Sequence, residues 1–383
     1  MKILMISTDR NIFKEGSPVR ARMVEYGTLS DELHIIVFAK KYLDFVPKKI
    51  SDRVWIHPTN SVNRWFYVKD AVSLGKKIIA DSKLEVSDSV ITVQDPFETG
   101  LAGWRIAKKT GLKFHVQIHT DFLSPYFKKF SFLNSVRVFV ASFILPKADG
   151  IRVVSNRIKS SITTHNFRLK TTPVVLPIYT DISRIIQSPK NIDLHEKYPQ
   201  FKFIILMASR LAKEKNIGLA IRAFKKIIKK YPQTGLIIVG EGLEKRKLKK
   251  ITRFLGLKHS IIFEPWTNDL ASYYKSSNAY LLTSWYEGYG LTLVEAAACG
   301  CPIVTSDVGV AGEIAVDEKN AFVCPVSDGV CLTEKILQLI AENDLRKRFS
   351  MASEEILRPL ASFSKDQYFV NYKKSLELCF LQK

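Results

Sequence analysis

The chain has 383 residues, of which 46% are hydrophobic and 25% are charged, values that suit a soluble globular protein of two domains. No apolar run approaches the ~18–20 residues of a membrane span, and the short apolar run of residues 1–7 predicts a first strand rather than a signal peptide. The net charge of +21 leaves nucleic acid, an anionic membrane and small anionic substrates as partner classes. Because the chain has no recognisable nucleic-acid module, we expect no nucleic-acid partner.

The first half alternates apolar strands with helical stretches. This alternation predicts a parallel sheet with helices on both faces, whose ligands bind at the carboxyl ends of the strands. The predicted strands are 2–7, 33–39, 54–57, 89–93, 113–118, 150–154 and 173–176, and the predicted helices are 20–30, 65–81, 100–110, 132–145 and 157–165.

The second half repeats the pattern after a junction expected around residues 183–197. Its clearest strands are 201–207, 235–239 and 279–283, and its clearest helices are 291–299, 332–341, 344–360 and 366–379. The sequence therefore predicts an α/β protein.

The five cysteines lie in the last quarter of the chain. Their spacing matches no zinc pattern, and an odd number in a chain of this size argues against a disulfide framework. We expect reduced thiols in a cytoplasmic protein. The cysteines are Cys299, Cys301, Cys324, Cys331 and Cys379.

The most informative stretch is a strand, a polar loop and a helix. The helix 291–299 ends at Gly300, and Gly288 and Gly290 leave the backbone uncrowded where it begins. The first amides of a helix have no partners inside the helix, and its dipole favours negative charge there. A phosphate could therefore bind at this point.

Two carboxylates bracket this phosphate site. Glu287 lies in the loop and Glu295 lies about a turn and a half into the helix. A carboxylate beside a phosphate is repulsive unless it has another task. Accepting hydrogen bonds from the hydroxyls of a nucleotide sugar is such a task.

The residues from Glu287 to Val304 follow the pattern E-G-x-G-L-x-L-x-E-A-x-A-x-G-x-P-I-V. This pattern resembles the donor site of retaining glycosyltransferases of family 4, which have the GT-B fold. The resemblance implies two Rossmann-like parallel-sheet domains facing across a cleft, with the last helix crossing back to the N-terminal domain. It implies an acceptor-binding domain at 1–185, a donor domain at 186–362 and the crossing helix at 363–383.

A second match to the family is the R-L-x-x-x-K segment from Arg210 to Lys215. The resemblance implies that these two cations hold the donor diphosphate, because arginine offers a fork of N–H donors and lysine a compact charge. The backbone amides at Gly290 and Leu291 would assist them.

The resemblance also assigns the donor sugar and the ribose. Glu287 would be catalytic, because it positions the sugar and stabilises positive charge at the anomeric carbon. Gly288 and Tyr289 would lie beside the sugar, and Glu295 would bind the ribose hydroxyls.

The nucleobase is expected near Gly240 and Trp266. Gly240 opens a G-x-G turn after a strand, and Trp266 could stack on a base or belong to the core. Glu313 matches a glutamate of the family's closing loop.

In the N-terminal domain the family match makes His119 catalytic, at a strand end facing the donor sugar and acceptor. Gly16 and Ser17 stand in the loop that would cover the donor phosphates, although the family normally has two adjacent glycines there. Ser155 is expected to cap the helix that follows it.

The implied reaction moves a hexose from a UDP- or GDP-sugar to a hydroxyl of a glycan or lipid-linked acceptor, with retention of anomeric configuration, as in polysaccharide or glycolipid synthesis. No D-x-D sequence occurs, so we expect no metal and no other cofactor.

Three alternatives stay open. A sugar-nucleotide epimerase can share the GT-B fold, because a fold does not fix a function. A dinucleotide oxidoreductase needs a third glycine where Lys245 stands. A non-catalytic basic binding protein would explain the charge but would leave the two glutamates without a task.

The segment 126–145 combines basic residues with an apolar, aromatic stripe. This combination suits either a membrane interface or a core helix with a basic lead-in. Together with the net charge, it suggests a cytoplasmic protein in peripheral contact with the anionic inner face of a membrane.

Overall fold

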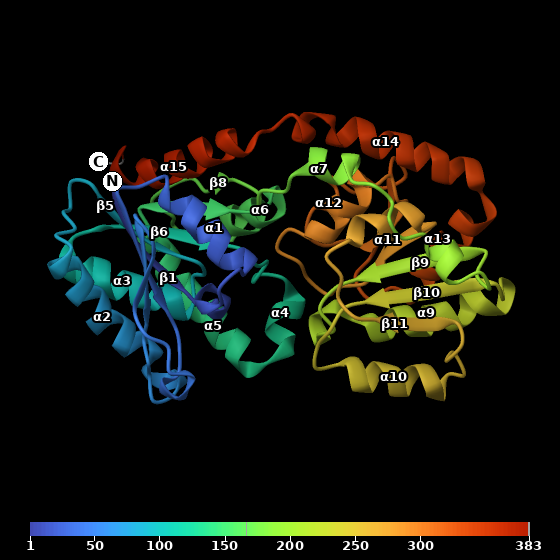
Figure 1. The fold of residues 1–383 in the computed structure, drawn as a ribbon, viewed down its shortest axis with the longest axis horizontal. Helices are drawn as coiled ribbons and strands as arrows, with labels where there is room; N and C mark the ends of the chain where they lie inside the picture. The colour runs from blue at the N-terminus through green and yellow to red at the C-terminus, as the bar shows by residue number, and fades with distance from the viewer. Residues whose placement is uncertain (166, 382–383) are drawn as a thin grey trace. The chain divides into compact units, whose positions relative to one another are not determined.

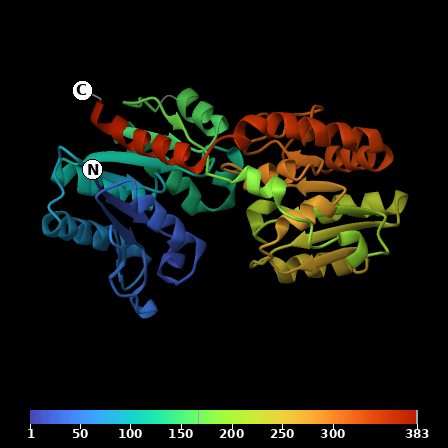
Figure 2. The same ribbon diagram turned by 45° about the horizontal axis from the view of Figure 1, so that its top comes forward.

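The computed structural model describes residues 1–165 and 167–381. The chain divides into two compact units (Figure 1 and Figure 2). Unit 1 comprises residues 1–177 together with the stretch from 366 onward, and unit 2 comprises residues 178–365.

The boundaries differ from the predicted 185/186 and 362/363. The first lies earlier, at Pro177/Ile178, because α7 (Ile182–Gln187) packs against helices α12 (Leu291–Ala298) and α14 (Asn343–Ala361) of unit 2. Ser183 Oγ also donates a hydrogen bond to the Ala361 carbonyl at 2.8 Å. The segment after Pro177 therefore belongs to unit 2.

Unit 1 holds, within the described residues, an eight-stranded sheet in the order β3-β4-β2-β1-β5-β6-β7-β8. Neighbouring strands are parallel except that β3 runs antiparallel to β4. The strands are β1 (Lys2–Ser7), β2 (Glu32–Val37), β3 (Lys48–Ser51), β4 (Val54–Pro58), β5 (Ser89–Val93), β6 (Lys113–Ile118), β7 (Gly150–Val153) and β8 (Val174–Val175). The sequence prediction missed β3, because an edge strand that begins with two lysines has no apolar run to mark it.

The helices of unit 1 follow the predicted ranges closely, and α4 is an addition to them. They are η1 (Arg10–Phe13), α1 (Pro18–Gly27), η2 (Lys41–Leu43), η3 (Arg64–Phe66), α2 (Tyr67–Asp81), α3 (Glu98–Thr110), α4 (Pro125–Phe130), α5 (Phe132–Ile144), η4 (Leu145–Lys147), α6 (Asn156–Thr164) and α15 (Lys365–Leu381). Ser155 caps α6 as predicted, since its hydroxyl accepts a hydrogen bond from the Ile158 amide.

Helix α15 returns to unit 1 and packs on its sheet (Figure 2). Gly150 permits the contact, because a Cβ there would lie 2.4 Å from Cys379 Sγ. Below the helix, Arg152 is fully buried and donates to the Tyr368 hydroxyl at 3.0 Å and to Gln117 Oε1 at 2.9 Å. Gln117 in turn donates to the Tyr372 hydroxyl at 3.0 Å. A buried polar network thus fixes α15 to β6 and β7.

Unit 2 holds, within the described residues, a six-stranded parallel sheet in the order β11-β10-β9-β12-β13-β14. Its strands are β9 (Phe203–Ala208), β10 (Thr234–Val239), β11 (Ile261–Glu264), β12 (Ala279–Leu282), β13 (Ile303–Ser306) and β14 (Ala321–Cys324). Besides α7, α12 and α14, its helices are α8 (Leu194–Lys197), η5 (Lys213–Lys215), α9 (Ile217–Lys230), α10 (Lys245–Phe254), α11 (Leu270–Ser276) and α13 (Gly329–Ala341).

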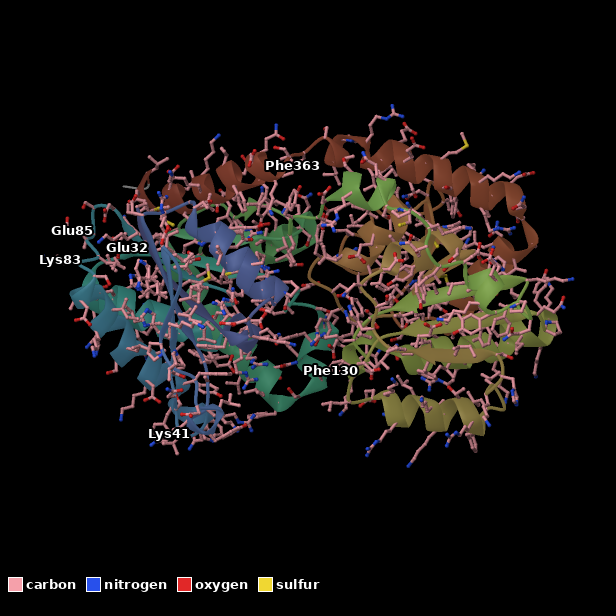
Figure 3. The ribbon with its side chains drawn as sticks, in the orientation of Figure 1. Glu32, Lys41, Lys83, Glu85, Phe130 and Phe363 are labelled. Atoms are coloured by element: carbon pink, nitrogen blue, oxygen red, sulfur yellow. A yellow bond between two sulfur atoms is a disulfide. The ribbon has the colours of Figure 1, made fainter. Side chains whose placement is uncertain are left out.

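The core of unit 2 forms because its helices are amphipathic. Helix α9 buries its apolar residues at helical spacing and leaves its lysines outside, the pattern that packs a helix on a sheet. The most basic helix, α10, buries only Leu248 and Thr252, and its long side chains extend away from the sheet (Figure 3).

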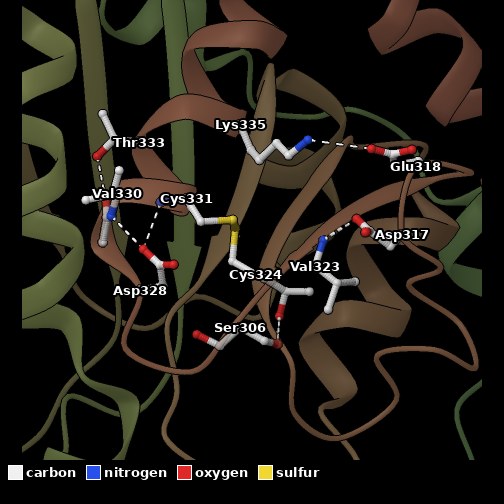
Figure 4. Close-up of a disulfide and its surroundings, with 12 residues drawn as sticks. Ser306, Asp317, Glu318, Val323, Cys324, Asp328, Val330, Cys331, Thr333 and Lys335 are labelled. Atoms are coloured by element: carbon white, nitrogen blue, oxygen red, sulfur yellow. Dashed lines mark hydrogen bonds and ion pairs between the residues drawn. A yellow bond between two sulfur atoms is a disulfide. The ribbon is translucent and has the colours of Figure 1, made fainter.

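Cys324 and Cys331 form a disulfide between the end of β14 and the first turn of α13 (Figure 4). The expectation that all cysteines are reduced is therefore wrong for this pair. Asp328 caps α13 by accepting from the amides of Val330 and Cys331, and this turn brings the two cysteine Cα atoms to 5.8 Å. Cys299, Cys301 and Cys379 are free.

Among the described residues, no helix combines the length and the apolar character needed to cross a bilayer.

Candidate functional site

The polar loops of unit 2 gather where its strand order reverses. In chain order, β10 and β11 are added on one side of β9, while β12, β13 and β14 lie on the other side. Parallel pairing puts the loops that follow β9 and β12 side by side at one edge of the sheet. Ligands of open α/β sheets bind outside the carboxyl ends of the strands at such a reversal.

An ion pair spans this reversal. Lys215, in the loop after β9, lies with Nζ 2.5 Å from Glu287 Oε1, in the loop after β12. Ser284 Oγ donates to the same carboxylate oxygen at 2.7 Å. Both members are mostly buried, with side-chain exposures of 16% and 12%. The sequence predicted both residues for the donor site, and the structure brings them into direct contact.

Hydrogen bonds to backbone carbonyl groups join the two loops around the pair. Thr283 Oγ1 donates to the Lys215 carbonyl at 3.0 Å and to the Asn216 carbonyl at 3.2 Å. The Trp285 amide donates to the Glu214 carbonyl at 2.9 Å. The ion pair is therefore flanked by hydrogen bonds that join the loops after β9 and β12.

The N-terminus of α12 opens beside this frame. Gly290 precedes the helix in the left-handed conformation, with φ +88°, and no side chain caps it. The first amides, beginning at Leu291, are oriented out of the helix end as in any α-helix. A glycine is required here, because other residues rarely adopt this φ. The structure thus offers an uncapped helix end three residues from Glu287.

The loop that ends at Gly290 is held from inside. The Tyr289 side chain is buried, and burial raises the pKa of its hydroxyl to about 12, with Glu313 contributing. Its carbonyl accepts from the Val310 amide at 2.9 Å, and a Cβ on Gly309 would lie 2.4 Å from that carbonyl oxygen. Gly288 is also buried. Any contact of Tyr289 with a bound sugar would come from its backbone.

Glu295 lies on α12 and is half-buried. The Tyr274 hydroxyl donates to its Oε2 at 3.1 Å, and burial raises the pKa of the carboxyl group. Tyr274 itself is buried and comes from α11. The carboxylate is thus positioned by a hydrogen bond from a neighbouring helix.

Arg210 differs from Lys215 in its exposure. Its side chain is 78% exposed and pairs with Glu214 at 3.2 Å, four residues later. An exposed guanidinium keeps most of its donors available for a ligand. Of the two predicted phosphate ligands, Arg210 is the more accessible.

The nucleobase candidates lie after β10 and β11. Gly240 has φ +144°, and a Cβ on it would lie 1.9 Å from the Ser209 carbonyl oxygen. A Cβ on Gly242 would lie 2.4 Å from the Leu211 carbonyl oxygen. The G-x-G sequence therefore lets the loop after β9 pack tightly on the loop after β10. Trp266 is 51% exposed, so the alternative of a core tryptophan is wrong.

His119 lies in unit 1, just past the end of β6. Burial, together with the nearby charges of Arg152 and Arg22, lowers the pKa of its imidazole to about 3. The side chain is therefore neutral at physiological pH and can act as a hydrogen-bond donor or acceptor without a charge.

In the loop after β1, the hydroxyl group of Ser17 is engaged in hydrogen bonds with neighbouring backbone groups. Gly16 has φ +70°, and no atom lies within 4 Å of the Cβ position it leaves open. Ser17 caps α1 by accepting from the Arg20 amide at 3.2 Å, and its hydroxyl donates to the Asn11 carbonyl at 2.6 Å. The Ser17 hydroxyl therefore has a structural task, and a ligand contact would come from the loop backbone.

The sequence reasoning missed a carboxyl group at the end of β5. The strand order of unit 1 reverses between β1 and β5, where Ser7 Oγ donates to Gln94 Oε1 at 2.7 Å. Next to them, Asp95 accepts from the Phe97 amide at 2.8 Å, and burial raises the pKa of Asp95 to about 6. The run Gln94-Asp95 directly after a predicted buried strand was the available signal.

Within the part of the chain that the structure describes, no group of three or more His, Cys, Asp or Glu side chains could hold a metal ion. The expectation of a metal-independent reaction stays a prediction.

Residues 191–356 match the family model of glycosyl transferases group 1. The matched region covers most of unit 2, including both loops of the Lys215–Glu287 pair, and none of residues 1–177.

A curated relative aligns with about half of the chain. The poly(glycerol-phosphate) alpha-glucosyltransferase of Bacillus subtilis (strain 168) is 28% identical over 179 residues, which are 46% of this chain and 26% of that enzyme. The alignment thus spans about a quarter of the length of that relative.

Solved structures resemble the whole chain. Sucrose-phosphate synthase from Thermosynechococcus elongatus has a TM-score of 0.81 at 18% identity and covers 100% of both chains. HepE from Anabaena in complex with UDP has a TM-score of 0.74 at 19% identity, covering 98% of this chain and 100% of that one. These likenesses show the fold, which is that of two Rossmann-like parallel-sheet domains of the GT-B type.

Proposed function

We propose that the protein is a glycosyltransferase that moves a hexose from a UDP- or GDP-sugar to a hydroxyl of a glycan or lipid-linked acceptor, with retention of anomeric configuration. The observation that carries the proposal is the Lys215–Glu287 pair, held at the strand reversal of unit 2 beside an uncapped helix end. The family match over residues 191–356 and the names of the relatives, a glucosyltransferase and a UDP complex, support it.

The donor diphosphate would bind to Arg210, Lys215 and the amides at Gly290 and Leu291. The leaving group is a nucleoside diphosphate, so negative charge grows on its oxygens during the reaction. Fixed N–H donors and cations that are already in place stabilise such charge without reorganisation. The exposed fork of Arg210 would reach the phosphates, while Lys215 would serve both the phosphate and Glu287.

Glu287 would hold hydroxyls of the donor sugar and stabilise positive charge at the anomeric carbon. Its fixed contacts with Lys215 and Ser284 give it one orientation. Glu295, positioned by Tyr274, would accept hydrogen bonds from the ribose hydroxyls. Trp266 is exposed enough to stack on the base beside Gly240.

His119 would contact the sugar or the acceptor as a neutral imidazole. No metal is required in this proposal, so transfer should persist in excess EDTA.

Calorimetric titration with UDP, GDP and ADP tests the donor site. We expect one nucleoside diphosphate to bind selectively, and Arg210→Ala to weaken it by about tenfold or more, the loss of a charge-assisted hydrogen bond. Lys213→Ala is the matched control, because Lys213 is an exposed cation three residues further along the same loop, at the start of η5. Equal effects of the two substitutions, or no nucleotide binding, would contradict the proposed site.

A second experiment tests the reaction class. The protein is incubated with the sugar nucleotide of the selected base, and the products are followed by NMR with and without an acceptor. We expect release of the nucleoside diphosphate and an acceptor-linked sugar with the donor's anomeric configuration. A sugar nucleotide with an inverted ring carbon would instead identify an epimerase.

A further inference from the structure

Helix α5 of unit 1 turns a second apolar face to solvent. Its buried side is formed by Asn134, Val138, Ala141 and Ile144. On its other side, large apolar residues at helical spacing are exposed, namely Phe132 (86%), Leu133 (41%), Val136 (39%), Phe139 (76%) and Phe143 (41%). A contiguous apolar patch of this kind on a soluble unit marks an interaction surface. We call these five residues the α5 stripe.

The stripe lies in a segment without negative charge. Residues 122–148 contain no Asp or Glu and carry the four cations Lys128, Lys129, Arg137 and Lys147. Lys128 and Lys129 belong to α4, which ends at Phe130 next to the start of α5 (Figure 3). Arg137 pairs with Glu98, so three of the four cations are left to set the charge of this surface.

Basic and aromatic groups also border the stripe from helix α3. The Trp104 ring packs edge-on against Phe143 with 4.8 Å between the ring centroids. Lys108 Nζ lies 5.6 Å from the centre of the Trp104 ring, and Lys147 Nζ lies 3.5 Å from the centre of the Phe143 ring. Aromatic rings interleaved with lysines are typical of segments that lie in the headgroup layer of a bilayer.

We propose that the α5 stripe and the lysines of α4 and η4 dock on the surface of an anionic lipid bilayer. The phenylalanines would enter the acyl boundary, and the lysines would contact lipid phosphates. Charge complementarity favours an anionic bilayer over other partners of this surface. A second copy of the chain would bring lysines against lysines, and a nucleic acid would leave exposed phenylalanines of an amphipathic helix without a partner.

This proposal goes beyond the proposed reaction and does not depend on it. The docking surface lies on unit 1, whereas the residues proposed to hold the donor diphosphate lie on unit 2. Vesicle binding can therefore succeed or fail independently of nucleotide binding.

Co-sedimentation with vesicles tests the docking surface. The full chain is mixed at low salt with vesicles of phosphatidylcholine alone or of equal parts phosphatidylcholine and phosphatidylglycerol. We expect binding to the anionic vesicles only. The double variant Phe132→Ser/Phe139→Ser should weaken that binding by about tenfold or more, because both rings leave the acyl boundary. Lys128→Gln/Lys129→Gln should weaken it by about tenfold and flatten its salt dependence.

Phe254→Ser is the matched control. Phe254 is 89% exposed and ends α10, the helix richest in lysine and arginine, so it tests whether any exposed ring beside cations suffices. We expect wild-type vesicle binding from this variant. The four substituted side chains of the test variants are exposed, so thermal unfolding should be unchanged.

Four results would overturn the proposal, and the first three concern the vesicles and the state of the protein itself. They are absence of binding to anionic vesicles, equal losses in the Phe254 and stripe variants, and a self-association measured by light scattering that only the stripe variant abolishes. The fourth result is a competing oligonucleotide that binds through Lys128 and Lys129 and displaces the vesicles, while the Phe132→Ser/Phe139→Ser variant binds vesicles as the wild type does.

Discussion

At the scale of single residues, the two ion pairs formed by the loop after β9 differ in burial and therefore in their expected contribution to stability. Lys215 and Glu287 are mostly buried, whereas Arg210 is largely exposed beside Glu214. A buried pair broken on one side leaves an uncompensated charge, whereas an exposed pair is screened by water. The contrast separates a residue that holds the site together from one that is free to meet a ligand.

We predict that Glu287→Gln lowers the free energy of unfolding by about 2 kcal/mol, because Lys215 then lacks a carboxylate while Ser284 keeps an acceptor. Arg210→Ala should change it by no more than about 0.5 kcal/mol. Urea unfolding at neutral pH measures both. Similar losses in the two variants would mean that the burial of the Lys215 pair has no energetic consequence.

A second residue-scale prediction concerns His115, which is fully buried with Nδ1 2.9 Å from Thr92 Oγ1. Burial lowers its pKa from 6.5 to about 3. Between these two pH values, His115 is protonated in the unfolded chain and neutral in the folded chain. The contribution of His115 to stability is therefore complete above pH 6.5 and is lost as the pH falls toward 3.

Replacing this group should flatten the acid side of the stability curve. We expect His115→Gln to reduce the slope of unfolding free energy against pH below 6.5 by up to about 1.4 kcal/mol per pH unit. The slope is compared with that of His259→Gln, a substitution at an exposed position. An unchanged slope in His115→Gln would show that the pKa of His115 is the same in the folded and the unfolded chain.

The chemistry of these residues was only partly visible in the sequence. Glu287 and Glu295 could be selected from their spacing, and Lys215 only from the resemblance to a known family. The structure places all three around one strand reversal. Their mutual pairing could not be read, because it depends on which loops the sheet order makes adjacent. Asp95 and Arg152 were missed because a polar residue in or after an apolar strand shows its role only when its surroundings are known.

At the scale of elements, the disulfide fixes the start of α13. The bridge closes a short loop between Cys324 and Cys331, and within that loop Ser327 accepts a hydrogen bond from Trp285 Nε1 at 2.8 Å. The bridge therefore supports, through Ser327, the loop that carries Glu287.

We predict that Cys331→Ser lowers the unfolding free energy by about 2 kcal/mol under oxidising conditions, the chain-entropy effect of a short closed loop. In the presence of a reductant, wild type and variant should unfold alike. Cys299→Ser, at a free thiol of the same unit, is the control. Equal stability of wild type and Cys331→Ser without reductant would mean that the bridge does not form.

Most elements were predictable because their patterns are local. Strands β1, β5 and β6 and helix α5 occur where runs of apolar residues or helical spacing placed them. The edge strand β3 and the short helix α4 were missed, since lysine-rich edges and single helical turns leave no periodic signal. The disulfide was missed because the turn capped by Asp328 brings the two cysteines together. The spacing of the cysteines in the sequence does not show that turn.

At the scale of the whole molecule, unit 1 is discontinuous in sequence. Its sheet is built from residues 1–177, and its last helix comes from beyond unit 2. The contact between α15 and the sheet of unit 1 contains buried polar groups. Arg152 donates hydrogen bonds there to neutral groups, among them the Tyr368 hydroxyl and the Leu176 carbonyl. Such a network specifies one docking position for α15, because each partner has a fixed direction.

We predict that Tyr372→Phe lowers the stability of unit 1 by about 1 kcal/mol, because Gln117 loses one acceptor. Val370→Ser, at a half-exposed position of the same helix, should have little effect. Hydrogen exchange on β6 and β7, followed by mass spectrometry, localises the change. Protection that falls equally in both variants would show that the hydrogen bond is not what secures α15.

The discontinuity also sets an order of assembly during synthesis. Domains normally fold as they leave the ribosome, the N-terminal one first. Here β6 and β7 emerge early but wait for α15, which is translated only after all of unit 2. During that interval the groove for α15 exposes Arg152 and Gln117 together with the surrounding apolar surface. In a nascent chain paused within unit 2, this surface would therefore stay exposed to water until the last helix docks.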